Sequence, residues 1–326
     1  MPRPPLSSSA ILLLLVVGSL AIGLASAPLV KVGLEALIPG SELLAGMTRA
    51  ELDPDDPQHG PFTWDFGKVS RRWLLVVVIA VFLVFRRKVA WGARAKEFLS
   101  GIPAWRRHLG LGVVAGLLVS LVYFGSLLHL ELLTWRPLPV GALALWTLEY
   151  AAGAAAVALL EELFFRAVML GTMVRDWGVA RGVMASTAVF AVVHAISGSL
   201  RVPDGWDPGV PIDLLRTYYT STDGGFGEDL RLMVGLALLG LMLSLLVLRT
   251  GSLWAAIGLH GMLVMSSRLG KQLTRPGAEY QDWLLGDRTF LVAGVVPMLI
   301  LVVGVALVHF WPRPPRLDQE VPASRK

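Results

Sequence analysis

The sequence contains no cysteine, so disulfides, thiolate metal sites and a cysteine nucleophile are excluded. It also lacks a Walker loop, a dinucleotide fingerprint, a Gly-x-Ser-x-Gly elbow and a His-Glu-x-x-His pair, which argues against nucleotide use, serine hydrolysis and ordinary zincin chemistry. Charge is scarce: 16% of the 326 residues are charged and 55% are hydrophobic, with a mean hydropathy of +0.64. This composition is typical of a polytopic membrane protein.

Apolar runs of a length that spans a bilayer, or nearly so, recur along the chain, and a membrane helix needs about 20 such residues. We expect an all-α fold, a membrane bundle with about eight transmembrane helices. The first run also resembles a cleavable signal peptide, and the second is short. The runs are residues 10–27, 73–85, 109–130, 138–160, 178–196, 230–248, 252–267 and 290–311.

The chain divides into four predicted segments. Residues 1–27 form an N-terminal transmembrane anchor or signal-like segment, and residues 28–137 hold an extracytoplasmic segment and two transmembrane helices. Residues 138–270 form a helix core with buried polar residues, and residues 271–326 hold the last transmembrane helix and a disordered basic tail.

Basic residues indicate the orientation in the membrane. Between Arg86 and Arg107 lie seven Lys or Arg residues and one acid, Glu97. Cytoplasmic loops carry such an excess, so we expect this loop on the cytoplasmic side. The formal charge of +5 is thereby explained by topology and requires no nucleic-acid partner. The expected surroundings are the lipid bilayer.

Four polar residues lie in apolar stretches: Glu161, Glu162, His194 and His260. A charge at the centre of a membrane helix costs about 2.5–3.5 kcal/mol, so such residues are rarely idle. Counted at 1.5 Å per residue from an arginine near the cytoplasmic end of each helix, Glu161, His194 and His260 lie at depths of about 21, 20 and 17 Å. These arginines are Arg175, Arg181 and Arg249, respectively. The similar depth of the three polar residues predicts one shared site for catalysis within the membrane.

The two glutamates have different expected roles, although both are assigned to the catalytic set. Glu162 and Arg166 are four residues apart, which suits an ion pair on one helix face. Glu161 points elsewhere and is free to act as a general base. A different interpretation stays open, in which the Glu–Arg pair and each histidine only stabilise helix packing.

A metal site is the competing chemical hypothesis. One carboxylate and two imidazoles, here Glu161, His194 and His260, are a sufficient ligand set for a catalytic zinc ion with an open water position. The spacing of these residues does not separate this hypothesis from a metal-free one.

These residues resemble the motifs of the CPBP group of intramembrane proteases, which includes CAAX prenyl endopeptidases of the Rce1 type and bacterial abortive-infection or bacteriocin-immunity relatives. Glu161, Glu162 and Arg166 match Glu-Glu-x-x-x-Arg, and Phe190 with His194 matches Phe-x-x-x-His. The resemblance covers roughly residues 140–270.

The resemblance implies that Glu161 and His194 activate a water molecule without a metal, while His260 and a family Asn or Asp hold the oxyanion. Arg166 and Phe190 would position these groups. The residue four positions after His260 is instead Val264, which removes one expected oxyanion donor.

The leading hypothesis is therefore an intramembrane endopeptidase that cleaves a membrane-anchored or lipid-modified protein, with a CAAX-like or C-terminal sorting tail as substrate. We expect it in a bacterial inner membrane, with the active site towards the cytoplasm. The alternative is a catalytically weak scaffold or bacteriocin-immunity-type protein of the same fold. A proton-coupled transporter comes third, because no inverted repeat of broken helices is visible.

Overall fold

The computed structural model describes residues 7–37, 105–198, 225–286 and 291–311, together with positions 73, 76–78, 80, 81 and 84. The chain divides into two compact units, Met1–Val89 with Ile196–Asp223, and Ala90–Ala195 with Gly224–Lys326. All six residues assigned to the predicted site belong to the second unit. Most of the predicted span at 73–85 and the tail after 311 lie outside the described residues.

The first unit contains helix α1, Ser8–Leu37. The helix extends past residue 27, the predicted end of the anchor, because the following residues are mostly Leu, Val, Lys, Glu and Ala, which favour or tolerate helix. Within this unit the Trp73 indole donates a hydrogen bond to the Ser26 hydroxyl at 2.7 Å.

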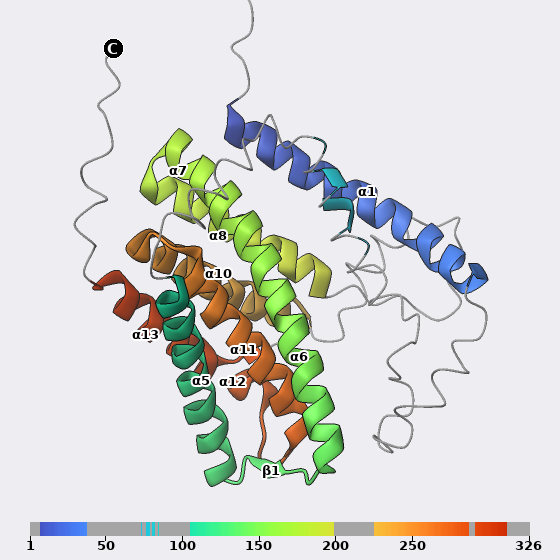
Figure 1. Cartoon of the computed structure of the whole chain (residues 1–326), viewed down its shortest axis with the longest axis vertical. Helices are drawn as coiled ribbons and strands as arrows, with labels where there is room; N and C mark the ends of the chain where they lie inside the picture. The colour runs from blue at the N-terminus through green and yellow to red at the C-terminus, as the bar shows by residue number, and fades with distance from the viewer. Residues whose placement is uncertain are drawn as a thin grey trace, which may run out of the picture. The chain divides into compact units, whose positions relative to one another are not determined.

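The second unit is a helix bundle with one small sheet (Figure 1). Its described elements, in chain order, are α5 (Trp105–His129), β1 (Leu133–Trp135), α6 (Val140–Glu161), η1 (Glu162–Leu170), α7 (Gly171–Trp177), α8 (Val179–Gly198), α10 (Gly225–Thr250), α11 (Leu253–Leu273), β2 (Thr274–Pro276), α12 (Asp282–Leu285), η2 (Leu291–Ala293) and α13 (Val295–His309).

Three consecutive elements, α6, η1 and α7, form the long helix that carries both glutamates. An apolar helical stretch of 35 residues runs through them from Leu143 to Trp177, past residue 160, where the predicted apolar run ends. Its middle part, η1, is a π-helix, and this change was not expected. The Glu162 N–H is shared between the carbonyls of Ala158 and Leu159, where the π-helix begins. π-helical turns are rare and frequent at functional sites.

Helices α5 and α11 pack closely through glycine. A Cβ atom on Gly112 would lie 2.8 Å from the Leu259 nitrogen, and one on Gly258 would lie 2.9 Å from the Val113 nitrogen. Only glycine allows two helix backbones to approach so closely. The Gly112-x-x-x-Gly116 pattern therefore serves packing within the chain. This contact holds α11, and with it His260, against the bundle.

The two-stranded antiparallel sheet of β1 and β2 corrects the expectation of a purely helical fold. Leu133 pairs with Pro276 and Trp135 with Thr274 in an antiparallel register. Each strand has three residues, too few for an alternating pattern that sequence could reveal. The sheet links the segment between α5 and α6 to the end of α11.

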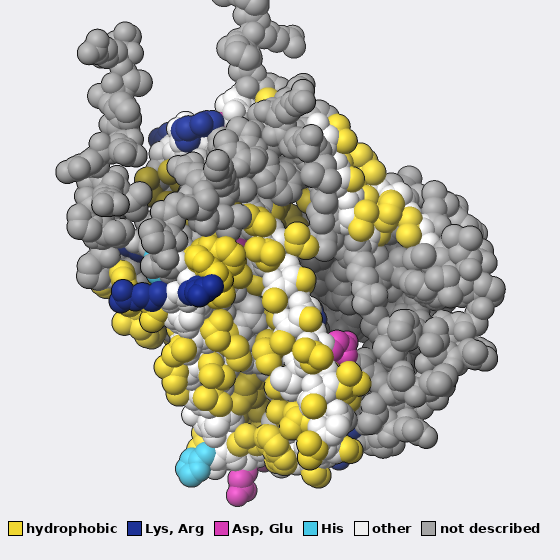
Figure 2. Space-filling view, in the orientation of Figure 1, with side chains coloured by type: hydrophobic (Ala, Val, Ile, Leu, Met, Phe, Trp, Pro, Cys, Tyr) yellow, Lys and Arg dark blue, Asp and Glu magenta, His cyan; other side chains and the backbone are white. Residues whose placement is uncertain are grey.

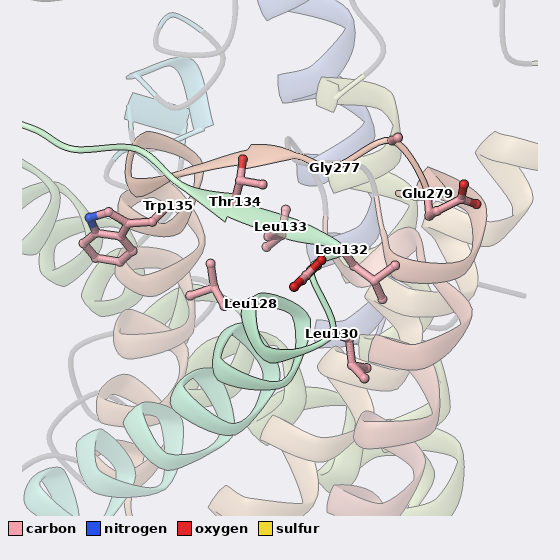
Figure 3. A pocket seen from close by; sticks show the side chains of 10 residues that line it. Leu128, Leu130, Leu132, Leu133, Thr134, Trp135, Gly277 and Glu279 are labelled. Atoms are coloured by element: carbon pink, nitrogen blue, oxygen red, sulfur yellow. The ribbon is translucent and has the colours of Figure 1, made fainter.

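A cavity of about 800 Å³ lies beside this two-stranded sheet (Figure 3). Its ionisable lining side chains are Glu131 and Glu279, and it shares no residue with the predicted site. The cavity is therefore separate from the predicted site. The other lining residues are Leu128, Leu130, Leu132, Leu133, Thr134, Trp135, Gly277 and Ala278.

Within the described residues, three helical stretches are long and apolar enough to cross a membrane: Trp105–His129, Leu143–Trp177 and Leu230–Thr250. Three shorter apolar helices accompany them, at Ser8–Gly23, Val179–His194 and Val295–His309. Hydrophobic side chains cover much of the described face in Figure 2, as lipid contact requires. The chain is an integral membrane protein, and the number of eight spans stays a prediction.

Candidate active site

Helix α8 brings His194 to Glu161. The Nε2 atom of His194 lies 3.0 Å from Glu161 Oε2, and its Nδ1 atom lies 2.8 Å from the Phe190 carbonyl oxygen. A carbonyl oxygen only accepts, so Nδ1 carries a proton and donates it. The contact between Nε2 and Oε2 then needs one further proton, held on either atom. Glu161 and His194 thus form a pair that shares a transferable proton.

The aromatic ring of Phe190 also contacts the His194 imidazole. The two ring centroids are 4.1 Å apart, with an interplanar angle of 38°. The Arg166 guanidinium lies over the Phe190 ring, with its Cζ atom 4.4 Å from the ring centroid. Phe165 meets Phe190 edge to face at 5.0 Å. This buried stack limits the rotamers available to the imidazole.

A second carboxylate–imidazole pair lies behind the first. Glu162 Oε1 lies 2.9 Å from Nδ1 of His260 and 3.3 Å from Nη1 of Arg166. The expected ion pair with Arg166 is present, and the contact with His260 is an addition that spacing did not predict. Glu162 is fully buried. Its carboxylate therefore contacts the site through His260, whose orientation it holds.

Arg166 is also held from α10. Its Nη2 atom donates to the Gly240 carbonyl oxygen at 3.4 Å. A Cβ atom on Gly240 would lie 3.0 Å from the Phe190 ring, so glycine is needed for Phe190 to lie this close. The contribution of α10 to the site was missed, because a backbone carbonyl leaves no signal in sequence.

The two pairs converge on Glu161. Its Oε2 atom lies 3.9 Å from Nε2 of His260, in addition to the 3.0 Å contact with His194. The side chains of Glu161 and His194 are 21% and 23% exposed, whereas that of His260 is 5% exposed. The Glu161 carboxylate and the His194 imidazole are therefore accessible to a water molecule, whereas His260 is nearly buried beside them. The structure thus brings together all six residues that the sequence singled out.

Metal binding by Glu161, His194 and His260 stays a prediction. In the part of the chain that the structure describes, no group of three or more His, Asp or Glu side chains has the arrangement needed to hold a metal ion. Glu161, His194 and His260 are near one another but do not form such a set as placed here. We therefore derive no step through a metal.

Val264 follows His260 by one helical turn and is half-buried. An isopropyl group offers no hydrogen bond, so the residue that would be a second oxyanion donor contributes none. The nearby Ser266 and Ser267 are half-buried on the same helix. On α11, His260 is the residue whose side chain lies beside Glu161, at 3.9 Å.

The described bundle of apolar helices thus holds two carboxylate–imidazole contacts, Glu161 with His194 and Glu162 with His260. In a comparison with known protein families, residues 142–265 match the Rce1-like family, described as type II CAAX prenyl endopeptidase Rce1-like. The resemblance found from the motifs is confirmed, and the matched segment contains all six site residues. It supports a CAAX-type protease of the membrane. No curated protein and no solved structure matched the chain.

Proposed function

We propose that the protein is a glutamate-dependent intramembrane endopeptidase that hydrolyses a peptide bond near the C-terminus of a membrane-anchored or lipid-modified protein. The observation that carries the proposal is the position of the Glu161 carboxylate between two imidazoles, partly exposed inside an apolar bundle. The Rce1-like match at residues 142–265 supports the same reaction class.

The reaction begins with a water molecule beside Glu161. Glu161 accepts one water proton while the water oxygen bonds to the carbonyl carbon of the substrate. The carbonyl oxygen becomes an oxyanion near Nε2 of His260. Since Nδ1 of His260 faces the Glu162 carboxylate, this imidazole donates to the oxyanion when both ring nitrogens carry protons.

Collapse of the tetrahedral intermediate breaks the carbon–nitrogen bond. The proton taken from water passes through the Glu161–His194 pair to the leaving amine. The distance of 3.0 Å between Glu161 Oε2 and His194 Nε2 suits such a transfer. The products are a new carboxyl terminus and a short peptide with a new amino terminus. The sum is hydrolysis, with no oxidant or reductant.

The cellular setting is proposed from the sequence. The basic loop from Arg86 to Arg107 supports a cytoplasmic orientation of that side, and the catalytic depth is compatible with attack from the cytoplasmic half of the bilayer. We propose a bacterial inner membrane, because the CPBP group, whose motifs this chain resembles, includes bacterial members. Candidate substrates are CAAX-like tails and C-terminal sorting tails.

The test compares membrane proteomes of cells that express the wild type or Glu161→Gln at equal level. Gln keeps the size of the side chain and removes its basicity, so substrates should accumulate uncut only with this variant. The matched control is Glu149→Gln, which changes an exposed glutamate on the same helix α6. Identical proteomes for folded wild type and Glu161→Gln would contradict the proposal.

A second candidate is supported by Val264. A catalytically weak scaffold or immunity-type protein would keep the fold and lose an oxyanion donor. In that case the Glu161→Gln variant would retain the cellular activity of the wild type, such as protection against a bacteriocin. Loss of that activity in Glu161→Gln favours proteolysis instead.

A metal-free reaction is part of the first proposal. Cleavage should survive dialysis of the detergent-solubilised protein against a chelator, and metal analysis should find less than one zinc ion per chain. Loss of cleavage that is restored by zinc would support the alternative ligand set of Glu161, His194 and His260.

A further inference from the structure

The cavity beside the two-stranded sheet combines an apolar wall with two carboxylates. Most of its lining side chains are apolar, and they come from the end of α5 and from β1 (Figure 3). Glu131 and Glu279 belong to the same lining, although they are far apart in the sequence. The volume of about 800 Å³ is within the range of small-molecule sites. The cavity therefore has the size of a binding site and a lining of mixed character.

The charge in this lining has one sign. Among the described residues that line the cavity, none is Lys, Arg or His. Glu131 and Glu279 are exposed, and the side chain of neither makes an ion pair or hydrogen bond with another residue in the described part of the chain. The lining is therefore complementary to a ligand that carries a positive charge.

Backbone contacts hold the two acidic segments together. Glu131 has a φ of 58°, in the left-handed region that residues other than glycine seldom adopt, and its N–H donates to the Leu128 carbonyl oxygen at 3.2 Å. Gly277 lies two residues before Glu279, and its N–H donates to the Leu132 carbonyl oxygen at 2.9 Å. A Cβ atom on Gly277 would lie 2.5 Å from the Glu131 carbonyl oxygen. The backbone positions from which both carboxylates extend are thus fixed.

The position of the cavity along α5 indicates where a ligand would come from. Arg106 and Arg107 are in the first turn of this helix of 25 residues, which extends for about 37 Å before it reaches the cavity. That length is close to the thickness of a bilayer with its headgroups, so the cavity lies at the interface of membrane and water. Leu130 and Trp135 line it and are 63% and 60% exposed. A molecule dissolved in the membrane can therefore reach the cavity.

The lining favours an organic cation over a metal ion. Calcium takes six to eight oxygen ligands, whereas two carboxylates line this cavity. The described residues hold no group of three or more His, Asp or Glu side chains arranged for a metal ion. Leucine side chains cannot replace the hydration shell of a metal ion, but they do bury an alkyl chain.

We propose that this cavity binds an alkylammonium amphiphile, with its charged head at the carboxylates of Glu131 and Glu279 and its chain on the leucine wall. The ammonium group donates charge-assisted hydrogen bonds to the carboxylates. The chain contacts Leu128, Leu130 and Leu132 and removes their apolar surface from water. The inference is independent of the proposed proteolysis, because no lining residue belongs to the predicted active site.

The experiment uses the full-length protein in a nonionic detergent and four soluble probes. Octylammonium has the charge and the chain, ethylammonium has the charge with a short chain, octanol has the chain without the charge, and octanoate carries the opposite charge. An apparent Kd is read from the rise of the thermal unfolding midpoint with probe concentration, since a ligand of the native state raises that midpoint. For the wild type we expect octylammonium to bind at least about 10-fold more tightly than octanol or ethylammonium, and octanoate to have no effect.

Three variants locate the binding. The double variant Glu131→Gln with Glu279→Gln removes both charges at nearly unchanged size, and the apparent Kd of octylammonium should rise about 10- to 100-fold. Leu130→Ser removes part of the exposed wall and should weaken octylammonium while leaving ethylammonium unchanged. The matched control Asp282→Asn removes an exposed carboxylate of α12 outside the lining and should keep the wild-type Kd.

Several results would overturn the inference. Equal Kd values for octylammonium and octanol would show that the carboxylates are not used, and an unchanged Kd in the double variant would place the binding elsewhere. Displacement of octylammonium by calcium chloride with an equal rise of the midpoint would identify a metal site instead. The single variants Glu131→Gln and Glu279→Gln give the same readout if the double variant does not fold. No readout involves cleavage, so this inference and the proteolytic function stand or fall separately.

Discussion

Replacing Gly258 by alanine tests how the packing of α5 on α11 supports the active site. The added Cβ atom would lie 2.9 Å from the Val113 nitrogen, with further backbone atoms of α5 in contact. Ordinary contacts begin at 3.4 Å, so the helices must separate by at least about 0.5 Å. Neither neighbouring backbone can rotate away as a flexible side chain would.

The separation reaches the chemistry because His260 lies two residues after Gly258. Two residues turn a helix by about 200°, so His260 faces away from α5, and a shift of α11 alone would compress its 2.9 Å contact with Glu162 to about 2.4 Å, below the ordinary hydrogen-bond range. We expect a loss of stability of about 1–3 kcal/mol from overpacking. Turnover should fall by about 10-fold or more, because small displacements of catalytic groups are costly.

The assay combines thermal unfolding in detergent with peptide cleavage. Gly110→Ala is the matched control, because a Cβ atom there has no neighbour within 4 Å. This control should be at least as stable as the wild type, since alanine is favoured over glycine in a helix. Wild-type stability and turnover for Gly258→Ala would refute the close contact of α5 with α11 and the coupling derived from it.

Other predictions follow from single contacts. Arg166→Gln leaves the buried Glu162 carboxylate without its ion pair and should destabilise the fold by about 3–5 kcal/mol in denaturation; combined with Glu162→Gln it should be milder, and equal losses would contradict the pairing. Phe190→Leu removes the ring against His194 and should lower kcat with little change in KM, measured by peptide cleavage; an unchanged kcat would contradict this role. Val264→Asn should raise kcat, by up to about 100-fold, by adding an oxyanion donor, whereas no increase in a folded variant would show that the donor is not needed.

Local patterns in the sequence predicted much of the fold and the identity of the site residues. Long apolar runs predict helices in a membrane, since unpaired backbone polar groups are excluded from lipid. The four-residue spacing of Glu162 and Arg166 predicts their contact, because helix geometry places such residues together. Counting along helices was enough to group Glu161, His194 and His260.

Tertiary structure decided the contacts that join distant parts of the chain. Glu162 and His260 are 98 residues apart, and their pairing depends on how α11 packs against the long helix. The small sheet likewise pairs strands that are far apart in the chain, β1 before α6 and β2 after α11. The π-helix of η1 likewise follows from a shift in backbone hydrogen bonding that propensity does not encode.

The sequence by itself therefore determined the class of protein, its helices and the groups capable of chemistry, because these depend on residue type and on spacing within one element. Only the tertiary structure decided which imidazole nitrogen faces which carboxylate. The physical reason is that close packing of glycine and alanine faces sets these distances to fractions of an ångström.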